Sequence, residues 1–253
     1  TGMLAQQLNV EVISNNIANM NTTAYKRQRA EFQDLLYQNI ERAGAASSDA
    51  GTVVPTGIQI GVGVRAAGVY RITSQGELVN SDTPLDVAIN GRGYFRVQLP
   101  SGEDAYTRAG SFQLSPTGEL VTSEGYTISP GITIPQEAVD ISINANGEVI
   151  VKISGQLTPQ NVGQFELALF PNGAGMEAIG NNLLLETPAS GAASIGAPNT
   201  PGYGSIVQGY LERSNVNSVS EITQLIAAQR AYEMNSKVIS TADEMLSVTS
   251  NLR

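Results

Sequence analysis

Apolar side chains recur at helical spacing near the C-terminal end of the chain. They stand at every seventh residue: Leu225, Tyr232, Ile239 and Leu246. This spacing places one apolar stripe along an α-helix. Ser218 and Glu221 form a capping box, which predicts that the helix starts near Val219 and continues to Leu252. A helix of that length would span about 50 Å, so it needs a partner to bury its stripe.

A second stripe lies at the start of the chain. It consists of Met3, Val10 and Ile17, with Gln6, Ile13 and Met20 three positions later. Short polar side chains interrupt this pattern at residues 14–16 and 19–23, and such side chains compete for backbone hydrogen bonds. The pattern therefore predicts a first helix that stops close to Asn21.

The next segment also has apolar residues at helical spacing. Phe32, Leu35, Leu36 and Ile40 predict a shorter amphipathic helix to about Arg42, with Gly44 as its stop. From residue 44 to 57 the composition changes to Ala, Ser, Gly and Thr, which favours an extended connection. Long connections of this kind are usually functional.

Turn residues separate short β-type runs between residues 58 and 185. Tyr94–Leu99 precedes Pro100-Ser101-Gly102, and Ser111–Leu114 precedes Pro116-Thr117-Gly118. Asn146-Gly147 separates two runs of alternating branched residues in the same way. Turn signals spaced by roughly ten residues favour several antiparallel hairpins in a small sandwich or barrel-like domain.

These patterns predict an α+β protein with long N- and C-terminal helices that pair as a coiled-coil-like module, and with a central antiparallel β-domain. We expect five parts: an N-terminal helical part, an extended linker or assembly segment, a β-rich domain, a return linker and a C-terminal helix, at residues 1–43, 44–70, 71–186, 187–213 and 214–253.

Two interpretations of the terminal stripes are open. The helices could form a hairpin that packs on the β-domain of the same chain, or they could pack against other copies of the chain. Spacing alone does not separate the two. The length of the last helix favours other copies, because a small β-domain offers too little surface to cover about 50 Å of helix. Alternation of large and small residues along the stripe also suits close helix packing.

Composition removes most catalytic hypotheses. The 253 residues contain no His, Cys or Trp, so the usual general base, the thiolate nucleophile and most zinc ligand sets are missing. We expect no catalytic, cofactor or metal site. A net charge of −9 opposes binding to nucleic acid or anionic lipid. No apolar run approaches the length of a membrane span, and we expect neither a cleaved signal peptide nor membrane insertion, with a few residues preceding Thr1.

Four local motifs have ordinary structural explanations that we prefer. Gly91-Arg92-Gly93 and the glycines at 57, 61 and 63 lack the spacing of phosphate loops and predict turns or bulges. Asn144–Glu148 lacks most calcium ligands and predicts a hairpin turn. Glu103 and Asp104 leave open a carboxylate-based cell-wall hydrolase. Lys26-Arg27-x-Arg29 predicts a solvated face or ion pairs with Glu31 and Asp34, with a binding patch as the alternative.

Both ends and the middle of the chain resemble one family. Residues 14–26 (SNNIANMNTTAYK) are similar to the Ala-Asn-x-x-Thr-x-Gly-Tyr/Phe-Lys signature of bacterial flagellar rod and hook proteins. Ala24 stands where the family usually has Gly, which argues against a positive φ there. Residues 86–95 (DVAINGRGYF) resemble an internal family motif, and residues 214–217, 229–237 and 241–246 resemble its C-terminal end. The length and the segment after residue 44 are most similar to distal-rod members, with proximal-rod and hook-type members as alternatives.

The resemblance implies a structural subunit that polymerises into a rigid helical tube, leaves the cytoplasm through the flagellar type III export apparatus, crosses the periplasm and transmits torque to the hook. Implied partners are other copies, proximal rod proteins, the hook protein and the surrounding P- and L-ring proteins. In family members the terminal helices pair and line the inner tube.

We therefore expect two sets of site residues. The self-assembly residues are Val10, Ile13, Ile17, Leu225, Tyr232, Ile239 and Leu246. The residues that match the family motifs are Ala18, Asn19, Thr22, Tyr25, Lys26, Gln229, Arg230 and Glu233.

Overall fold

The computed structural model describes residues 1–41, 56–156 and 158–251. The chain divides into two compact units, and each is described by itself. The helical unit contains Thr1–Ile17, Gln28–Tyr70 and Ser218–Arg253. The β unit contains Ala18–Arg27 and Arg71–Asn217. Both ends of the chain thus belong to the same unit.

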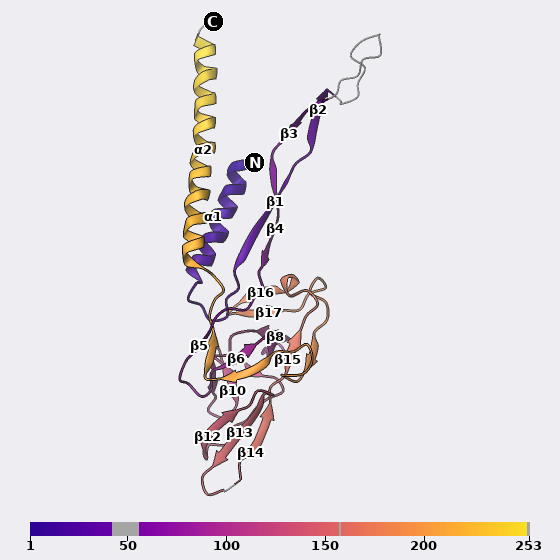
Figure 1. The fold of residues 1–253 in the computed structure, drawn as a ribbon, viewed down its shortest axis with the longest axis vertical. Coiled ribbons are helices and arrows are strands. Elements are labelled where there is room, and N and C mark those ends of the chain that lie inside the picture. Colours follow the sequence, from indigo (N-terminus) through magenta and orange to yellow (C-terminus); the bar gives the residue numbers. More distant parts are fainter. Residues whose placement is uncertain (42–55, 157, 252–253) are drawn as a thin grey trace. The chain divides into compact units, whose positions relative to one another are not determined.

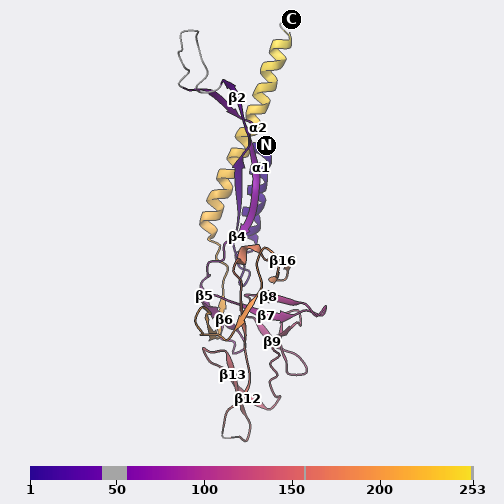
Figure 2. The ribbon, with the colours of Figure 1, turned by 90° about the vertical axis from the view of Figure 1, so that its right-hand side faces the viewer.

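Two helices of unequal length form the centre of the helical unit. Helix α1 covers Gly2–Ala18, and helix α2 covers Ser218–Asn251. They run antiparallel: Asn16 of α1 donates a hydrogen bond to Glu221 at the start of α2, and a Cβ added at Gly2 would lie 3.4 Å from Asn235. Figures 1 and 2 both show α1 beside the first part of α2, with the C-terminal part of α2 extending past α1.

The predicted pair of long helices is wrong. Helix α1 has 17 residues and α2 has 34, so α1 accompanies α2 only as far as about Asn235. The contact is also partly polar, because Asn16 and Glu221 are buried in it. We call residues 236–251 of α2 the overhang segment. The α+β class itself agrees with the structure, since the chain has two helices, first and last in the sequence, and a β-rich part between them in sequence.

Strands replace the helix that we expected at residues 32–42. Strand β1 (Gln28–Asp34) pairs with β4 (Val64–Arg71), and β2 (Tyr37–Glu41) pairs antiparallel with β3 (Ile58–Gly61). In β1, Gln28, Ala30 and Phe32 are half-buried, and Arg29 and Glu31 between them are exposed. This period of two is that of a strand, and it competes with the helical spacing of Phe32, Leu35 and Leu36.

The segment expected to be extended, residues 44–57, lies mostly outside the described residues, which resume at Thr56. The rest of the expected 44–70 linker contains strands β3 and β4. Both belong to the two-stranded pairings of the helical unit. A Cβ at Gly63, between these strands, would meet the Thr1 side chain, so this bend lies against the start of the chain.

The β unit is built around a nine-stranded sheet whose strands pair antiparallel. Its main path runs β16-β17-β8-β7-β11-β10-β9, with β15 pairing both β7 and β18. The strands of this sheet are β7 (Tyr94–Gln98), β8 (Asp104–Thr107), β9 (Phe112–Leu114), β10 (Leu120–Thr122), β11 (Thr127–Ile128), β15 (Leu167–Leu169), β16 (Glu177–Gly180), β17 (Leu183–Leu185) and β18 (Ser194–Gly196).

The predicted hairpins are confirmed. Strands β7 and β8 pair across the turn at Pro100-Ser101-Gly102, and β9 and β10 pair across Pro116-Thr117-Gly118. Strands β12 (Ala138–Ile143) and β13 (Glu148–Ile153) pair across Asn144–Gly147, and β14 (Gln160–Gln164) completes a three-stranded sheet. Gly147 takes a φ of 79°, a left-handed conformation that glycine adopts without strain.

Two further pairings join the beginning and the end of the β unit. Strand β5 (Leu78–Asn80) pairs with β20 (Tyr210–Glu212), and β6 (Val87–Asn90) pairs with β19 (Ser205–Gln208). Residues 187–213, expected as a return linker, thus contain strands β18, β19 and β20. These pairings fix where the chain leaves the β unit to begin α2.

Apolar side chains of the sheets form the core of the β unit. Phe95, Phe112 and Phe165 pack ring against ring, with centroids 5.1 to 5.9 Å apart. A smaller cluster gathers Tyr106 and Phe170, whose rings meet edge to face at 4.7 Å. Edge-to-face pairs of this kind stabilise a core beyond the area that they bury.

Candidate assembly surface

The predicted stripe on α2 becomes more exposed toward the C-terminus. Leu225 is half-buried, whereas Tyr232, Ile239 and Leu246 are 39%, 52% and 69% exposed. Ala228, beside the first of them, is only 4% exposed. The stripe is therefore partly covered where α1 accompanies α2, and it is open to solvent along the overhang segment.

Apolar exposure on the overhang segment is not confined to the predicted stripe. Its large apolar side chains are more than half exposed at Val238, Ile239, Met245, Leu246 and Val248. Large exposed apolar patches on soluble proteins mark interaction sites, so these side chains are a candidate assembly surface. A helix with such a surface is expected to pack against another protein surface.

The three predicted residues of α1 have different environments. Ile13 is buried at 3% exposure, and Val10 and Ile17 are half-buried. The buried face of α1 also includes Ala5 and Val12, which the predicted stripe did not include. The structure thus uses Ile13 to hold the helical unit together.

Val10 and Tyr232 meet in a groove between the two helices. We call it the helix groove; it measures about 480 Å³ and is lined by Gln7, Val10, Glu11, Gln229, Tyr232 and Glu233. Val10 and Tyr232 supply its apolar surface, and Gln7 donates a hydrogen bond to Glu11 at 3.0 Å along the rim. Two residues of the C-terminal family motif, Gln229 and Glu233, therefore lie beside two predicted self-assembly residues. Arg230, between them, is exposed and does not line the groove.

The N-terminal motif residues form a turn rather than a surface site. Helix α1 ends at Ala18. The Thr22 hydroxyl donates to the Asn19 side chain, and the Thr22 amide donates to the Asn19 carbonyl, both at 3.1 Å. The Tyr25 amide donates back to the Thr22 carbonyl at 3.3 Å. These short-range bonds turn the chain from α1 into the β unit.

Ala24 corrects one expectation from the sequence. Its φ is 59°, so this position takes the left-handed conformation although it holds Ala instead of Gly. The residue is buried, and its amide donates to the Glu212 carbonyl at 2.7 Å. The surrounding contacts therefore impose a conformation that costs an alanine about 1–2 kcal/mol.

Lys26 belongs to a buried ionic cluster. Its amino group pairs with the Glu212 carboxylate and donates to the Ser74 carbonyl at 2.9 Å. The second oxygen of Glu212 accepts from Arg108 Nε at 2.6 Å. Lys26, Arg108 and Glu212 are each no more than 8% exposed. We call these three residues the buried ion cluster. The expected pairing of Lys26 with Glu31 or Asp34 is wrong, because burial in the β unit gives it Glu212.

Opposing effects set the protonation of this cluster. Burial alone would raise the pKa of Glu212, but the charges of Arg108 and Lys26, with their hydrogen bonds, outweigh burial and hold the pKa below its ordinary value. Burial lowers the pKa of Lys26, and the Glu212 charge opposes this shift only in part. The carboxylate is thus ionised at neutral pH and neutralises buried cations.

Asn16 makes buried polar contacts in the helical unit, as the buried ion cluster does in the β unit. Its side-chain amide donates to the Gln28 carbonyl at 2.8 Å and to Glu221 at 3.0 Å, and its oxygen accepts from the Gln28 amide at 2.8 Å. It is 1% exposed. One side chain thus connects α1 to the start of β1 and to α2.

Sequence reasoning missed the roles of Asn16, Glu212 and Arg108. Asn16 follows Ile13 by three residues and so lies on a face with an apolar neighbour, a signal that we took only for a helix end. Glu221 was assigned to a capping box, yet it also accepts the bond from Asn16. No local pattern marks Glu212 or Arg108, because their partners are distant in sequence.

The glycine motif at residues 91–93 confirms the predicted turn. It joins β6 to β7, and the carbonyls of Gly91 and Gly93 accept hydrogen bonds from the Arg108 guanidinium at 2.6 and 2.8 Å. A phosphate loop would instead present backbone N–H groups ahead of a helix. These glycines allow the chain to approach Gly204, whose Cα would lie 2.9 Å from a Cβ at Gly91.

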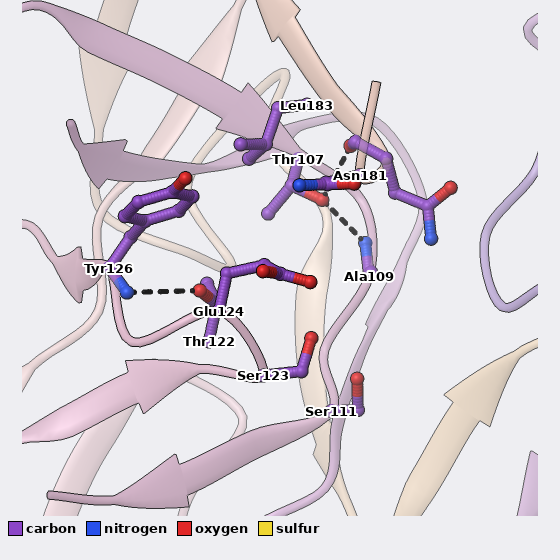
Figure 3. A pocket seen from close by; sticks show the side chains of 10 residues that line it. Thr107, Ala109, Ser111, Thr122, Ser123, Glu124, Tyr126, Asn181 and Leu183 are labelled. Carbon is purple, nitrogen blue, oxygen red and sulfur yellow. Dashed lines mark hydrogen bonds between the residues drawn. The ribbon is translucent and has the colours of Figure 1, made fainter. Parts of the chain in front are cut away.

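One small pocket of the β unit is lined mainly by polar side chains. Figure 3 shows it lined by Thr107, Thr122, Glu124 and Tyr126, with the Thr107 hydroxyl bonded to the Ala109 amide at 3.1 Å. Its volume is about 40 Å³, and two other pockets of the β unit measure about 380 and 190 Å³. The carboxylate pair weighed for hydrolysis, Glu103 and Asp104, lies elsewhere on the exposed β7–β8 hairpin, where Asp104 faces Arg96 at 3.5 Å.

Metal-binding clusters and membrane-spanning helices are both absent from the described part of the chain. Residues 1–41, 56–156 and 158–251 contain no cluster of three or more Asp, Glu, His or Cys side chains with the geometry to hold a metal ion. Among the same residues, neither helix combines the length and apolarity that a membrane span requires.

Family models match three parts of the chain. They are described as Flagella basal body rod protein at residues 1–26, Flagellar hook protein FlgE/F/G D1 domain at residues 88–151, and Flagellar basal body rod FlgEFG protein C-terminal at residues 207–252. The first covers α1 and the motif turn, and the last covers nearly all of α2. These matches fall on the segments that carried the resemblance.

Curated relatives match the chain from end to end. The flagellar basal-body rod protein FlgG of Caulobacter vibrioides is 65% identical over 253 residues, covering 100% of this chain and 97% of the relative. FlgG of Agrobacterium fabrum is 51% identical, with 99% and 95% covered. The flagellar hook-basal body complex protein FlhP of Bacillus subtilis is 27% identical, with 98% and 94% covered. The chain therefore belongs to the family of flagellar basal-body rod proteins.

Proposed function

We propose that the chain is a structural subunit of the distal rod of the flagellar basal body. Copies assemble into a rigid helical tube that crosses the periplasm, carries the export channel and transmits motor torque to the hook. The observation that carries this proposal is the exposed apolar surface of the overhang segment, on a chain 65% identical over its full length to a basal-body rod protein.

Exposed apolar side chains on α2 supply a physical reason for polymerisation. Val238, Ile239, Met245, Leu246 and Val248 are each more than half exposed, and burying one large apolar side chain contributes about 1.5 to 3 kcal/mol. Five such side chains along one helix give a strong tendency to associate. If these side chains pack against a different surface of the next copy, the contacts do not close on themselves and the copies extend into a filament.

The proposed partners follow from this position. They are other copies of the chain, proximal rod proteins at one end, the hook protein at the other, the P- and L-ring proteins around the rod, and the type III export apparatus that passes the chain without signal cleavage. We propose no binding to nucleic acid, no insertion into the membrane and no enzymatic activity. The 44–57 segment, most of which lies outside the described residues, is proposed as an assembly element that stiffens the tube.

Electron microscopy of the concentrated protein tests the proposal. Hollow, straight tubes that appear above a critical concentration are expected. A monodisperse monomer at all concentrations under rod-forming conditions would contradict it.

Position along the rod has its own test. Basal bodies isolated from cells that lack the chain should keep a short proximal rod and lose the distal part. Complete loss of the rod would favour a proximal subunit, and an intact rod that lacks a hook would favour a hook-type axial protein.

A further inference from the structure

A pocket of about 380 Å³ lies beside the glycine turn at residues 91–93, wholly within the β unit. We call it the turn pocket. Its wall combines residues 73–75, the turn with Tyr94 at the start of β7, side chains between Leu169 and Gly173, and Arg108. Its volume lies in the range of small-ligand sites, about 300–1,000 Å³. None of these residues has a role in the proposed assembly.

The hydroxyl of Tyr94 is a hydrogen-bonding group that its own chain leaves without a partner. Tyr94 is only 9% exposed, and its ring meets Phe170 edge to face with centroids 6.0 Å apart. Among the residues that the structure describes, none bonds this hydroxyl, although a buried Tyr hydroxyl usually has a partner. Burial raises the pKa of Tyr94, and the charges of Arg108 and Arg71 oppose this only in part. The hydroxyl therefore keeps its proton at neutral pH and can donate it to a ligand in the pocket.

Arg92 supplies an available positive charge on the same wall. Its side chain is exposed and forms no ion pair within the described part of the chain. Arg108 is already engaged, because it donates to Glu212 and to the carbonyls of Gly91 and Gly93. Of the described residues that line the pocket, none is Asp or Glu. An anion in the turn pocket would therefore meet one free cation and one free hydroxyl.

The space in front of the Tyr94 hydroxyl is open because residue 173 is glycine. A Cβ at Gly173 would lie 3.1 Å from this oxygen. Apolar side chains complete this side of the pocket: Leu169, Phe170 and Pro171. The pocket thus offers polar donors next to an apolar wall, an arrangement that orients a ligand with one charged and one apolar end.

We propose that the turn pocket binds a carboxylate joined to a small apolar group. Arg92 pairs with the carboxylate, the Tyr94 hydroxyl donates to one of its oxygens, and the apolar group packs on Leu169 and Pro171. One cation and one neutral donor suit a singly charged carboxylate better than a doubly charged phosphate, which needs more donors. The carboxylate can belong to a free acid or to a protein side chain.

Binding of 3-phenylpropionate to the intact chain at low concentration tests the site. We expect saturable binding by calorimetry and NMR, with a Kd in the range of about 1 mM for a ligand of this size. Its neutral analogue, 3-phenylpropan-1-ol, lacks the charge and should bind about ten-fold more weakly. Phenyl phosphate should bind no more tightly than the carboxylate.

Four variants separate the contributions of the wall. Arg92→Gln and Tyr94→Phe each remove one interaction with the carboxylate and should raise the Kd by about five- to ten-fold. Gly173→Ala should also weaken binding, because its methyl group would occupy the space in front of the hydroxyl. Lys152→Gln removes a positive charge at an exposed residue of β13 and should leave the Kd unchanged. Circular dichroism should give the same spectrum for every variant.

The outcomes either support the carboxylate site or overturn it. Equal affinity for the acid and the alcohol, no saturable binding to the wild type, or an unchanged Kd in both Arg92→Gln and Tyr94→Phe would overturn it and leave the rod function untouched. A second probe, N-acetyl-Phe-Glu-amide, separates the two sources. Tighter binding of this peptide than of 3-phenylpropionate assigns the carboxylate to a protein side chain, and tighter binding of 3-phenylpropionate assigns it to a free acid.

Discussion

At the scale of single residues, contacts with distant parts of the chain override local preference. Ala24 adopts a positive φ because its amide is bound by Glu212 and the turn at Asn19–Thr22 fixes the chain on its other side. The family signature has Gly at this position, and the positive φ of Ala24 explains why, because glycine adopts this conformation without strain. Lys26 was visible in the sequence as a motif residue, but its burial depends on Glu212 and could not be inferred from neighbours.

Replacing Ala24 with Gly should stabilise the β unit. Relief of left-handed strain exceeds the extra entropy of the unfolded chain, and we expect a gain of about 0.5–1 kcal/mol in the free energy of unfolding. Urea denaturation of the dilute protein measures it. Ala178→Gly, at an exposed residue of β16 without a positive φ, should instead destabilise. A loss of stability in Ala24→Gly would show that the position does not need the left-handed conformation.

Substitutions in the buried ion cluster should lower the free energy of unfolding by unequal amounts. Glu212→Gln leaves two buried cations without their counter-charge and should lower the free energy of unfolding by about 3–5 kcal/mol. Lys26→Met keeps the Glu212–Arg108 pair and should cost only about 1–2 kcal/mol. Glu177→Gln, at an exposed carboxylate of β16, serves as the neutral control in the same denaturation series. Equal costs for the first two variants would contradict the assigned pairing.

Acid stability should depend on Glu212. Its pKa is lower in the folded than in the unfolded protein, so the unfolded chain binds more protons between the two values. The stabilisation is complete above the unfolded pKa, about 4.3 for Glu, and is lost as pH falls through the folded pKa. Thermal melting from neutral pH into this range should show a steeper loss for the wild type than for Glu212→Gln. Parallel melting profiles for the two proteins would rule out the Glu212 carboxylate as the source of the acid-dependent loss of stability.

At the scale of elements, local signals predicted some parts well. The start of α2 at Ser218 and the hairpins at residues 100–102, 116–118 and 144–147 follow from capping and turn residues that act over four positions. The segment at residues 28–41 did not follow, because Phe32, Leu35 and Leu36 also satisfy a helical period. The alternation of Ala30 and Phe32 was the better signal, and pairing with the distant β4 determined the outcome.

Asn16 is expected to hold the elements of the helical unit together. Asn16→Ala removes bonds to Gln28 and Glu221 in a buried site and should cost about 2–3 kcal/mol, despite the better helix propensity of alanine. Loss of the helical signal at 222 nm should come at lower urea than in the wild type. Ser14→Ala, on the exposed face of the same helix, should leave the midpoint unchanged. An unchanged midpoint for Asn16→Ala would remove it from this role.

At the scale of the whole molecule, part of the candidate site could be predicted. The periodic stripe predicted a helix at Tyr232, Ile239 and Leu246, and the structure has them on α2 with exposed side chains, while their role in assembly stays a prediction. It could not reveal which part of α2 lies beside α1: Gly2 lies against Asn235, Leu225 is half-buried and Leu246 is exposed. The groove was also beyond the sequence, since it combines Val10 and Tyr232 from opposite ends of the chain. The proposed function rests on the exposed stripe together with relatives that match from end to end.

The central claim is that the open stripe of the overhang segment drives assembly. Ile239→Asp places a charge in this surface without touching the β unit, and desolvating an unpaired carboxylate in a packed contact is costly. Sedimentation and electron microscopy across a concentration series compare it with the wild type and with Ile239→Leu, which keeps the surface apolar. The account predicts tubes from the wild type and Ile239→Leu, and folded monomers without tubes from Ile239→Asp. Normal tubes from Ile239→Asp at the wild-type critical concentration would contradict it.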